Sequence, residues 1–290
     1  MKRRGESAAA AWLLLPALSF FGLFIVYPFL DVIYTSFTSW DGFSRPVFVG
    51  LKNYRTLAQP DGLFLKALGN TTLFAVYTVV GKNVLALLLA VLLSSRLRLR
   101  TFYRTALFLP VCLSFVAVGV IWAYVFDPSF GLVNAILFAL GKAEPISWLG
   151  EPGLALVCVA FVDVWKWTGY HVVLYLAGLQ TIPAELYEAS ALDGASAAQN
   201  FAYITLPQLV PVVLINVIIS LMGAYSVFDV IFVMTRGGPY NSTQTLLTYM
   251  FDVTFREYHI GLGATVVVVL FVLVIAMTAI QNRLARRAEA

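Results

Sequence analysis

The sequence predicts an all-α membrane protein, a bundle of six transmembrane helices with a helix–turn–helix in one cytoplasmic loop. Of its 290 residues, 60% are hydrophobic and 12% are charged, whereas soluble domains have about 25% charged residues. A soluble fold could not bury so much apolar surface, but lipid can solvate it. The second observation is a series of apolar stretches of roughly 20 residues, the length that crosses a bilayer. The third is an uneven distribution of Lys and Arg between the loops.

Six apolar stretches qualify as spans, and no long polar segment separates them. The whole chain, 1–290, is therefore expected to form one transmembrane domain. The first stretch follows Met-Lys-Arg-Arg as in a signal peptide. It is longer than the apolar part of such a peptide, about 7–15 residues, and no small-residue cleavage site follows it, so it is expected to remain as a span. The expected spans cover residues 11–36, 71–95, 103–126, 154–179, 208–234 and 262–280.

Lys and Arg residues concentrate on one side of these spans. The two termini and the loops after spans 2 and 4 together contain ten Lys and Arg residues against five Asp and Glu residues, whereas the opposite loops contain seven of each. Cytoplasmic loops carry an excess of Lys and Arg. Both termini and the loop 181–207 are therefore expected in the cytoplasm.

The loop 181–207 has the signals of two short helices. Pro183 fits a first helical position, and Gly194 fits a position after a helix end that needs a positive φ. Ser196 and Gln199 have the spacing of a capping box, which starts a new helix, and Pro207 is expected to open span 5. The loop contains no Lys or Arg although it faces the cytoplasm. It has apolar residues around Glu188, the pattern of a docking element for a basic groove on a partner.

The same loop contains, in order, Glu188-Ala189-Ser190, three residues, Gly194, nine residues and Ile204-Thr205-Leu206-Pro207. This arrangement resembles the EAA loop of ABC importer permeases, in which Ser190 would replace the second Ala, a small residue for a small one. The resemblance implies that Glu188 binds a basic residue in a cleft of an ATPase and transmits its closure to the spans. The residues implied in ATPase coupling are Glu188, Ala189, Ser190, Asp193, Gly194, Ile204, Leu206 and Pro207.

Four further blocks extend the resemblance over most of the chain: Gly50-Leu51-Lys52-Asn53-Tyr54, Phe108-Leu109-Pro110, Phe130-Gly131-Leu132-Val133-Asn134 and Gly237-Gly238-Pro239. They are similar to blocks in the carbohydrate-import branch, that of the maltose, lactose and glycerol-3-phosphate type permeases. The resemblance implies a multi-pass subunit of the bacterial inner membrane. It would assemble with a second permease and two ATPase subunits, be served by an extracytoplasmic solute-binding protein, and transport a small polar solute of the carbohydrate kind. No nucleic-acid partner is expected.

The chain itself is not expected to hydrolyse ATP. A phosphate-binding loop reads Gly-x-x-x-x-Gly-Lys-Ser/Thr, and both Gly81-Lys82 and Gly141-Lys142 lack the upstream Gly and the following hydroxyl residue. ATP and Mg are therefore expected on the partner ATPase, with no cofactor bound by this chain. No metal site is expected either, because His171 and His259 have no metal-ligand spacing.

Ionisable residues inside the expected spans are the candidates for the solute path. Such residues are costly in lipid and face the bundle interior or a wet cavity. Asp163, Lys166, Trp167 and Tyr170 share one face of span 4 at helical periodicity, and Tyr225 and Asp229 are expected to share a face of span 5. The candidate substrate-path residues are Asp163, Lys166, Trp167, Tyr170, Tyr225, Asp229 and Lys82.

Counting the helical rise of 1.5 Å per residue places Lys82, Asp163 and Tyr225 at similar depth, so these side chains are predicted to meet. Two interpretations stay open. The residues line a chamber for a polar solute, with aromatic faces for sugar rings, or the lysines neutralise neighbouring carboxylates and hold helices together. A lysine in the chamber would also suit a phosphate or an acidic sugar. The alternative function is an ion-coupled secondary transporter that uses Asp31, Asp163 and Asp229, which would leave the EAA-like loop unexplained.

Overall fold

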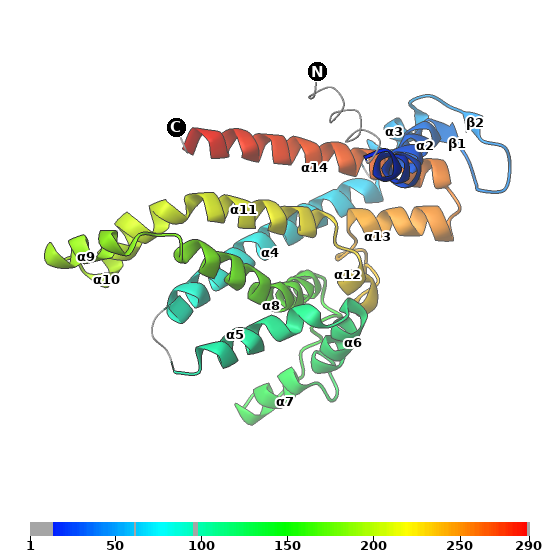
Figure 1. Cartoon of the computed structure of the whole chain (residues 1–290). Helices are drawn as coiled ribbons and strands as arrows, with labels where there is room; N and C mark the ends of the chain where they lie inside the picture. Colours follow the sequence, from blue (N-terminus) through cyan, green and yellow to red (C-terminus); the bar gives the residue numbers. More distant parts are fainter. Residues whose placement is uncertain (1–13, 61, 95–97, 289–290) are drawn as a thin grey trace, which may run out of the picture. The chain divides into compact units, whose positions relative to one another are not determined.

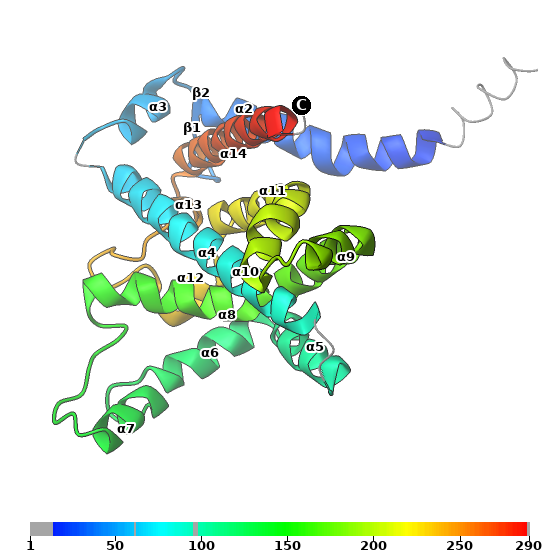
Figure 2. The ribbon, with the colours of Figure 1, turned by 90° about the vertical axis from the view of Figure 1, so that its left-hand side faces the viewer.

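The computed structural model describes residues 14–60, 62–94 and 98–288. The chain divides into two compact units. One contains Met1–Gly62 and Met250–Val272, and the other contains Leu63–Tyr249 and Leu273–Ala290. Figures 1 and 2 show that both units are built almost entirely of helices. Each unit is described by itself.

The first unit begins with a helix that is continuous from residue 14 to the end of α2. The side-chain amide of Asn53 donates hydrogen bonds to the carbonyls of Ser36 and Thr38. The hydroxyl of Thr265 also donates to the Ser36 carbonyl, at 3.1 Å, so α14 is tied to the end of α2. The elements are a π-helical segment Gly22–Val26, α2 Tyr27–Ser36, β1 Thr38–Ser39, β2 Val47–Phe48, α3 Lys52–Leu57, a π-helical segment Asp252–Arg256 and the start of α14 Ile260–Ala288. The two strands are antiparallel, with Thr38 opposite Phe48.

An exposed turn follows β1 and is organised by one carboxylate. Asp41 Oδ1 accepts hydrogen bonds from the backbone N–H groups of Phe43 and Ser44 and from the Ser44 hydroxyl. Hydrogen bonds to the charged form of a carboxyl favour that form. The bonds from the Ser44 backbone, the Ser44 hydroxyl and the Phe43 backbone, in that order of size, lower the pKa of Asp41 from 3.8 to about 2.

The second unit is organised by α4, which packs along both α8 and α11. Small residues of α4, Ala86 and Ala90, lie against Val172 and Tyr175 of α8 in a buried cluster. Small residues let helix backbones approach closely, which drives association in lipid. The elements are α4 Leu63–Ser94, α5 Arg100–Phe108, a 3₁₀ turn Leu109–Cys112, α6 Phe115–Val125, α7 Leu132–Ala139, α8 Pro152–Leu179, α9 Ala184–Leu192, α10 Ala197–Asn200, a π-helical segment Phe201–Thr205, α11 Leu206–Tyr225, α12 Asp229–Met234 and α13 Leu246–Phe251.

Within the described residues, four helical stretches are long and apolar enough to cross a membrane: Leu14–Ser36, Leu63–Ser94, Ala197–Tyr225 and Ile260–Gln281. A fifth is possible if the bent pair Arg100–Cys112 and Phe115–Val125 is one span. The sequence predicts six. Helix α8, the remaining expected span, is 28 residues long, but Asp163, Lys166 and His171 reduce its hydropathy. Its burial among other helices is consistent with those polar side chains, because they avoid lipid.

The expected span over 103–126 is not a single continuous helix. Helix α5 ends at Phe108. After the 3₁₀ turn and two extended residues, Leu113 and Ser114, α6 follows at a bend of 99°. Pro110 accounts for the break, because proline has no N–H to donate and its ring clashes with the carbonyl four residues earlier in a helix.

The prediction of one helix over 208–234, opened by Pro207, is wrong. The helix begins at Ala197 and runs through the π-helical segment to Tyr225. A capping box at Ser196 starts it, since the Ser196 hydroxyl accepts from the Gln199 N–H and the Gln199 side chain accepts from the Ser196 N–H. The π-helical turn precedes Pro207 and accommodates the proline ring inside a continuous helix. The chain then leaves the helix at Ser226 and restarts in α12.

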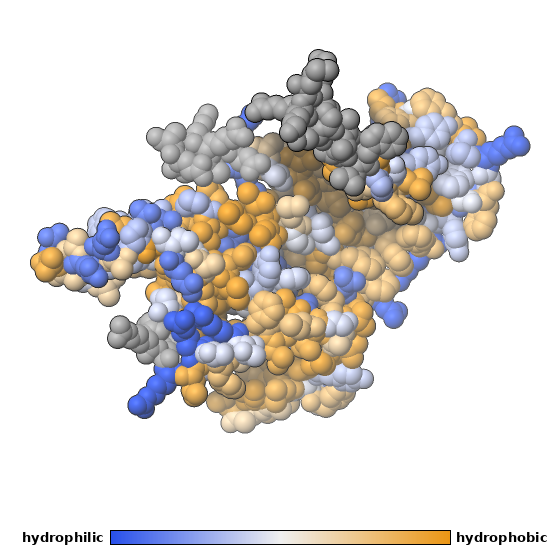
Figure 3. Space-filling model, viewed as in Figure 1, coloured by the Kyte–Doolittle hydropathy of each residue, from blue (hydrophilic) through white to orange (hydrophobic). Residues whose placement is uncertain are grey.

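The surface of the second unit is divided between apolar and polar regions. Figure 3 shows apolar residues over the visible face around α6, and hydrophilic residues gathered at α9 and α10. An extensive apolar surface marks contact with lipid or with other membrane chains.

Candidate functional site

A cavity of about 230 Å³ lies within the second unit, between α4, α6, α8 and the junction of α11 with α12. Its polar lining includes Lys82, Asp163, His171, Ser220 and Asp229. The aromatic side chains of Phe115 and Trp167 also line it, with their ring centroids 6.0 Å apart. An apolar cavity with a few convergent polar groups is the usual form of a site for a small molecule.

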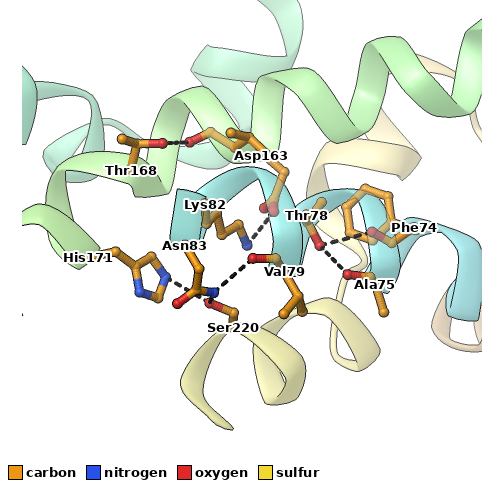
Figure 4. A network of polar contacts seen from close by, with 11 residues as sticks. Phe74, Ala75, Thr78, Val79, Lys82, Asn83, Asp163, Thr168, His171 and Ser220 are labelled. Atoms are coloured by element: carbon orange, nitrogen blue, oxygen red, sulfur yellow. Dashed lines mark hydrogen bonds and ion pairs between the residues drawn. The ribbon is translucent and has the colours of Figure 1, made fainter. Parts of the chain in front are cut away.

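Lys82 and Asp163 form a buried ion pair across α4 and α8 (Figure 4). The Lys82 Nζ and Asp163 Oδ2 atoms are 2.5 Å apart, and only 3% and 5% of the two residues is exposed. The sequence-based prediction that these two side chains meet is confirmed. Each charge neutralises the other where water is scarce, which is the condition for burying either one.

Lys166 is not among the residues that line the cavity, although it is only three residues from Asp163. Its ammonium donates hydrogen bonds to the carbonyls of Pro110, Val111 and Leu113, at 3.0, 3.2 and 2.5 Å. These carbonyls belong to the break between α5 and α6, where helical partners are missing. Lys166 therefore replaces the lost backbone hydrogen bonds of the break. The sequence predicts that Asp163, Lys166, Trp167 and Tyr170 share one helix face. Asp163 and Trp167 line the cavity, whereas Lys166 binds the carbonyls of the break.

Two of the predicted tyrosines are not part of the cavity lining. The ring of Tyr170 packs against that of Trp167, at a centroid distance of 5.8 Å. The hydroxyl of Tyr225 lies 3.1 Å from the Thr72 hydroxyl and joins α11 to α4. The prediction that Tyr225 and Asp229 share a helix face is wrong, because α11 ends at Tyr225 and Asp229 begins α12. Asp229 nevertheless reaches the cavity.

A series of hydrogen bonds beside the cavity joins α4, α8 and α11. It was not predicted from the sequence. The Tyr175 hydroxyl donates to Asn83 Oδ1 at 2.7 Å, and Asn83 Nδ2 donates to Ser220 Oγ at 3.1 Å. Ser220 Oγ lies 3.2 Å from His171 Nε2, and His171 Nδ1 lies 2.7 Å from Asn216 Oδ1. The available signal was the four-residue spacing of His171 and Tyr175, and of Asn216 and Ser220, in apolar stretches.

The donor and the acceptor of each hydrogen bond in this series can be assigned from its ends. Asn216 Nδ2 donates to the Val212 carbonyl, so Asn216 Oδ1 is the acceptor toward the histidine and His171 Nδ1 carries the hydrogen. His171 Nε2 then accepts from the Ser220 hydroxyl, which satisfies every partner with a neutral ring. Both nitrogens of His171 are therefore committed, as is the hydroxyl hydrogen of Ser220.

The EAA-like loop forms two helices joined by a tight turn. Helix α9 begins at Ala184, one residue after the expected Pro183. Gly194 has φ +76°, a conformation that costs other L-residues about 1–2 kcal/mol, so its predicted positive φ is confirmed. The Ala195 N–H donates to the Ser190 carbonyl at 3.0 Å, and the Tyr187 hydroxyl lies 2.9 Å from that of Thr205. The second contact ties α9 to the start of the long helix.

The coupling residues differ in exposure. Glu188, Ala189 and Asp193 are exposed, and Ser190 is half-buried. The carboxylate of Glu188 is thus presented on an exposed face next to the turn. Ile204 is half-buried, whereas Leu206 and Pro207 are exposed on the long helix.

The fold is that of an ABC importer permease. It matches a chain of a bacterial ABC transporter involved in the import of the acidic polysaccharide alginate with a TM-score of 0.86, at 23% identity, over 99% of this chain and 98% of that one. The chain belongs to the family described as binding-protein-dependent transport system inner membrane component, which residues 82–290 match.

Several relatives align with nearly the whole chain. The lactose transport system permease protein LacF of Rhizobium radiobacter is 37% identical over 95% of this chain and 93% of its own length. The multiple sugar-binding transport system permease protein MsmF of Streptococcus mutans is 34% identical over 92% and 91%. The probable ABC transporter permease protein YurN of Bacillus subtilis is 35% identical over 93% of each. The predicted membership of the ABC importer permeases is confirmed.

The chain is therefore the permease component of a binding-protein-dependent ABC importer, a multi-pass protein of the inner membrane and a transport component rather than an enzyme. The alternative of an ion-coupled secondary transporter is not favoured, because the relatives are subunits of ABC systems.

Proposed function

We propose that this permease carries a sugar or a sugar-like polar solute into the cytoplasm, driven by ATP hydrolysis on partner subunits. The observation that carries the proposal is the full-length similarity to two permeases whose names specify sugars, one for lactose and one for multiple sugars. The cavity supports it, since Phe115 and Trp167 provide apolar faces for a sugar ring and Ser220 and Asp229 provide acceptors for its hydroxyl groups.

We infer that the chain crosses the membrane six times with both termini in the cytoplasm. In this topology four crossings are the apolar helices. The fifth is α8, whose polar side chains are buried, and the sixth is the bent pair α5 and α6, which together act as one crossing. The excess of Lys and Arg in the termini and in the loops after the second and fourth crossings supports this orientation. It places the loop with α9 and α10 in the cytoplasm.

This cytoplasmic loop is the proposed contact with the ATPase. The partners would be a second permease, two ATPase subunits that bind ATP and Mg, and an extracytoplasmic solute-binding protein. Glu188 would bind a basic residue of the ATPase, because its carboxylate is exposed beside apolar residues, with Leu192 90% exposed. A charged group at the centre of an apolar contact determines register and specificity.

A single long helix would transmit movement of this loop to the cavity. The helical stretch Ala197–Tyr225 has 29 residues and begins at the turn of the loop. Ser220 and Gly223, near its other end, line the cavity. At a rise of 1.5 Å per residue, the turn and Ser220 are roughly 35 Å apart. Closure of the ATPase pair would thus tilt this helix and open the cavity to the outside. ATP hydrolysis would then open the cavity to the cytoplasm.

The test is affinity purification of the tagged permease from native membranes, with ATPase activity assayed on the eluate and uptake assayed in proteoliposomes. Glu188→Lys is expected to lose ATPase capture and to lower uptake at least about tenfold, because reversing an interfacial charge costs several kcal/mol and 1.4 kcal/mol is tenfold. Glu185→Lys, one turn away on the same helix and also exposed, is the control and is expected to keep both. Normal uptake by Glu188→Lys would refute the coupling role, and a chain that elutes without any ATPase would refute the proposed function.

A further inference from the structure

The charges around the cavity restrict the kind of sugar that it can hold. The charged lining residues are Lys82, Asp163 and Asp229. Lys82 is buried in its ion pair with Asp163, so its charge is already neutralised. The other lysine near the cavity, Lys166, has three N–H groups and donates to three backbone carbonyls. Lys166 keeps its positive charge, 4.7 Å from the ring centroid of Phe115, but it is not among the lining residues and its three N–H groups are already used.

Asp229 is the unbalanced charge of this lining. Asp229 is exposed, and among the described residues no ion pair or hydrogen bond reaches its carboxylate. The cavity lining therefore has a net charge of −1. In the low dielectric of a membrane protein such a charge acts strongly on a solute a few ångströms away.

The uncharged polar groups of the lining provide both acceptors and donors. His171 has no free nitrogen, because Nδ1 bonds to Asn216 and Nε2 bonds to Ser220. Ser220 uses its hydrogen toward His171 and one lone pair toward Asn83, which leaves a lone pair as its remaining capacity. The remaining acceptors are Ser220 Oγ and the two oxygens of Asp229, whereas the Ser226 hydroxyl and the Trp167 indole N–H of the same lining are donors. Discrimination by charge therefore comes from Asp229.

We propose that the cavity selects an uncharged or positively charged, hydroxyl-rich sugar and excludes an anionic one, with Asp229 as the specificity-determining residue. A hydroxyl or ammonium group donates to the carboxylate of Asp229, whereas a carboxylate or phosphate group is repelled by its charge. This inference deepens the proposed function, since it rests on the cavity being the solute site.

The local potential can be measured without knowing the natural solute. Gly223 lines the cavity and has open space at the position of an added Cβ, so Gly223→Cys introduces a thiol there. Cys112 and Cys158 are first replaced by Ala. The importer complex is placed in nanodiscs of uncharged phosphatidylcholine and treated with a cationic or an anionic methanethiosulfonate. Gly153→Cys on α8, which also has open space and is not among the lining residues, is the control.

The cationic reagent is expected to react with Gly223→Cys at least about tenfold faster than the anionic one, relative to the same ratio at Gly153→Cys. Adding Asp229→Asn is expected to remove most of this preference. An equal ratio at the two positions, a preference that survives Asp229→Asn, or a thiol at position 223 that neither reagent reaches would overturn the proposal.

Protection of the same thiol by sugars tests selection directly. Glucosamine, glucose and glucuronate share one ring and differ in charge. Glucosamine and glucose are expected to slow the reaction of Gly223→Cys more than glucuronate does. In the Asp229→Asn variant, glucuronate and glucose are expected to slow it equally. Protection by glucuronate equal to that by glucose before this substitution would overturn the proposal, as would the absence of protection by all three. If the ATPase is captured in the same preparation, such a result contradicts the selection of sugars by this cavity and leaves the proposed function standing.

Discussion

Replacing Lys166 by methionine tests whether this side chain maintains the break between α5 and α6. Methionine is similar in length and apolar, so Lys166→Met removes the ammonium without leaving a large void. The Lys82 and Asp163 pair is left intact, because Lys166 takes no part in it. The substitution therefore isolates the three hydrogen bonds to Pro110, Val111 and Leu113.

The expected loss of stability follows mainly from the carbonyls of Val111 and Leu113, because the Pro110 carbonyl also accepts from the Leu113 N–H at 3.2 Å. A carbonyl left without a donor costs about 1–3 kcal/mol, so two of them cost about 2–6 kcal/mol. Because the chain at the break has room to regain some partners, we expect a loss of about 3–5 kcal/mol. On the scale of about 2 °C per kcal/mol for chains of somewhat smaller size, the apparent melting temperature should fall by about 6–10 °C.

The buried thiol of Cys158 provides the assay. In a Cys112→Ala background, a thiol-reactive fluorophore reports unfolding in detergent as Cys158 becomes accessible. All variants are heated at one fixed rate, since irreversible unfolding makes the midpoint depend on rate. Lys142→Met, at an exposed lysine, is the control and should change stability by no more than about 0.5 kcal/mol. A midpoint for Lys166→Met equal to that of Lys142→Met would refute the assigned role.

Two further predictions concern a close helix contact and an outer turn. Gly169→Ala should abolish the folded fraction in size-exclusion chromatography, because its Cβ would overlap the Leu107 carbonyl oxygen, whereas Gly153→Ala on the same helix has open space and should fold normally; equal yields would contradict this packing. The Asp41 carboxyl should titrate by carbon-13 NMR near pH 2 instead of 3.8. Its contribution to turn stability is full above pH 3.8 and is lost as the pH falls through about 2. Ser44→Ala should raise the pKa of Asp41 by removing a hydrogen bond to its charged form, and a wild-type pKa near 3.8 would contradict the assignment.

The parts of the structure that the sequence predicted are those determined by local chemistry. The capping box of Ser196 and Gln199 and the positive φ of Gly194 depend on residues within one or two turns. The pairing of Lys82 with Asp163 could be predicted because two charges in apolar helices at similar depth have few other partners.

The parts that could not be predicted depend on distant contacts. Hydropathy describes how a segment partitions into lipid, not whether its helix is continuous, so the helix end at Tyr225 and the restart at Asp229 were hidden in one apolar stretch. Pro110 was visible as a helix breaker, but its neighbouring carbonyls are satisfied by Lys166, 56 residues away in sequence. The orientation of Lys166 toward the break follows from that contact.

The lysine at the break also bears on the source of energy for transport. In carriers that use sodium gradients, unwound helices offer backbone carbonyls to an ion that binds on one side and leaves on the other. Here three such carbonyls hold an ammonium group that is covalently part of the chain. This cation can neither dissociate nor cross the bilayer, so the broken helix has no exchangeable ion through which a gradient could act. At this break the carbonyls therefore have a structural role and offer no site for a coupling ion.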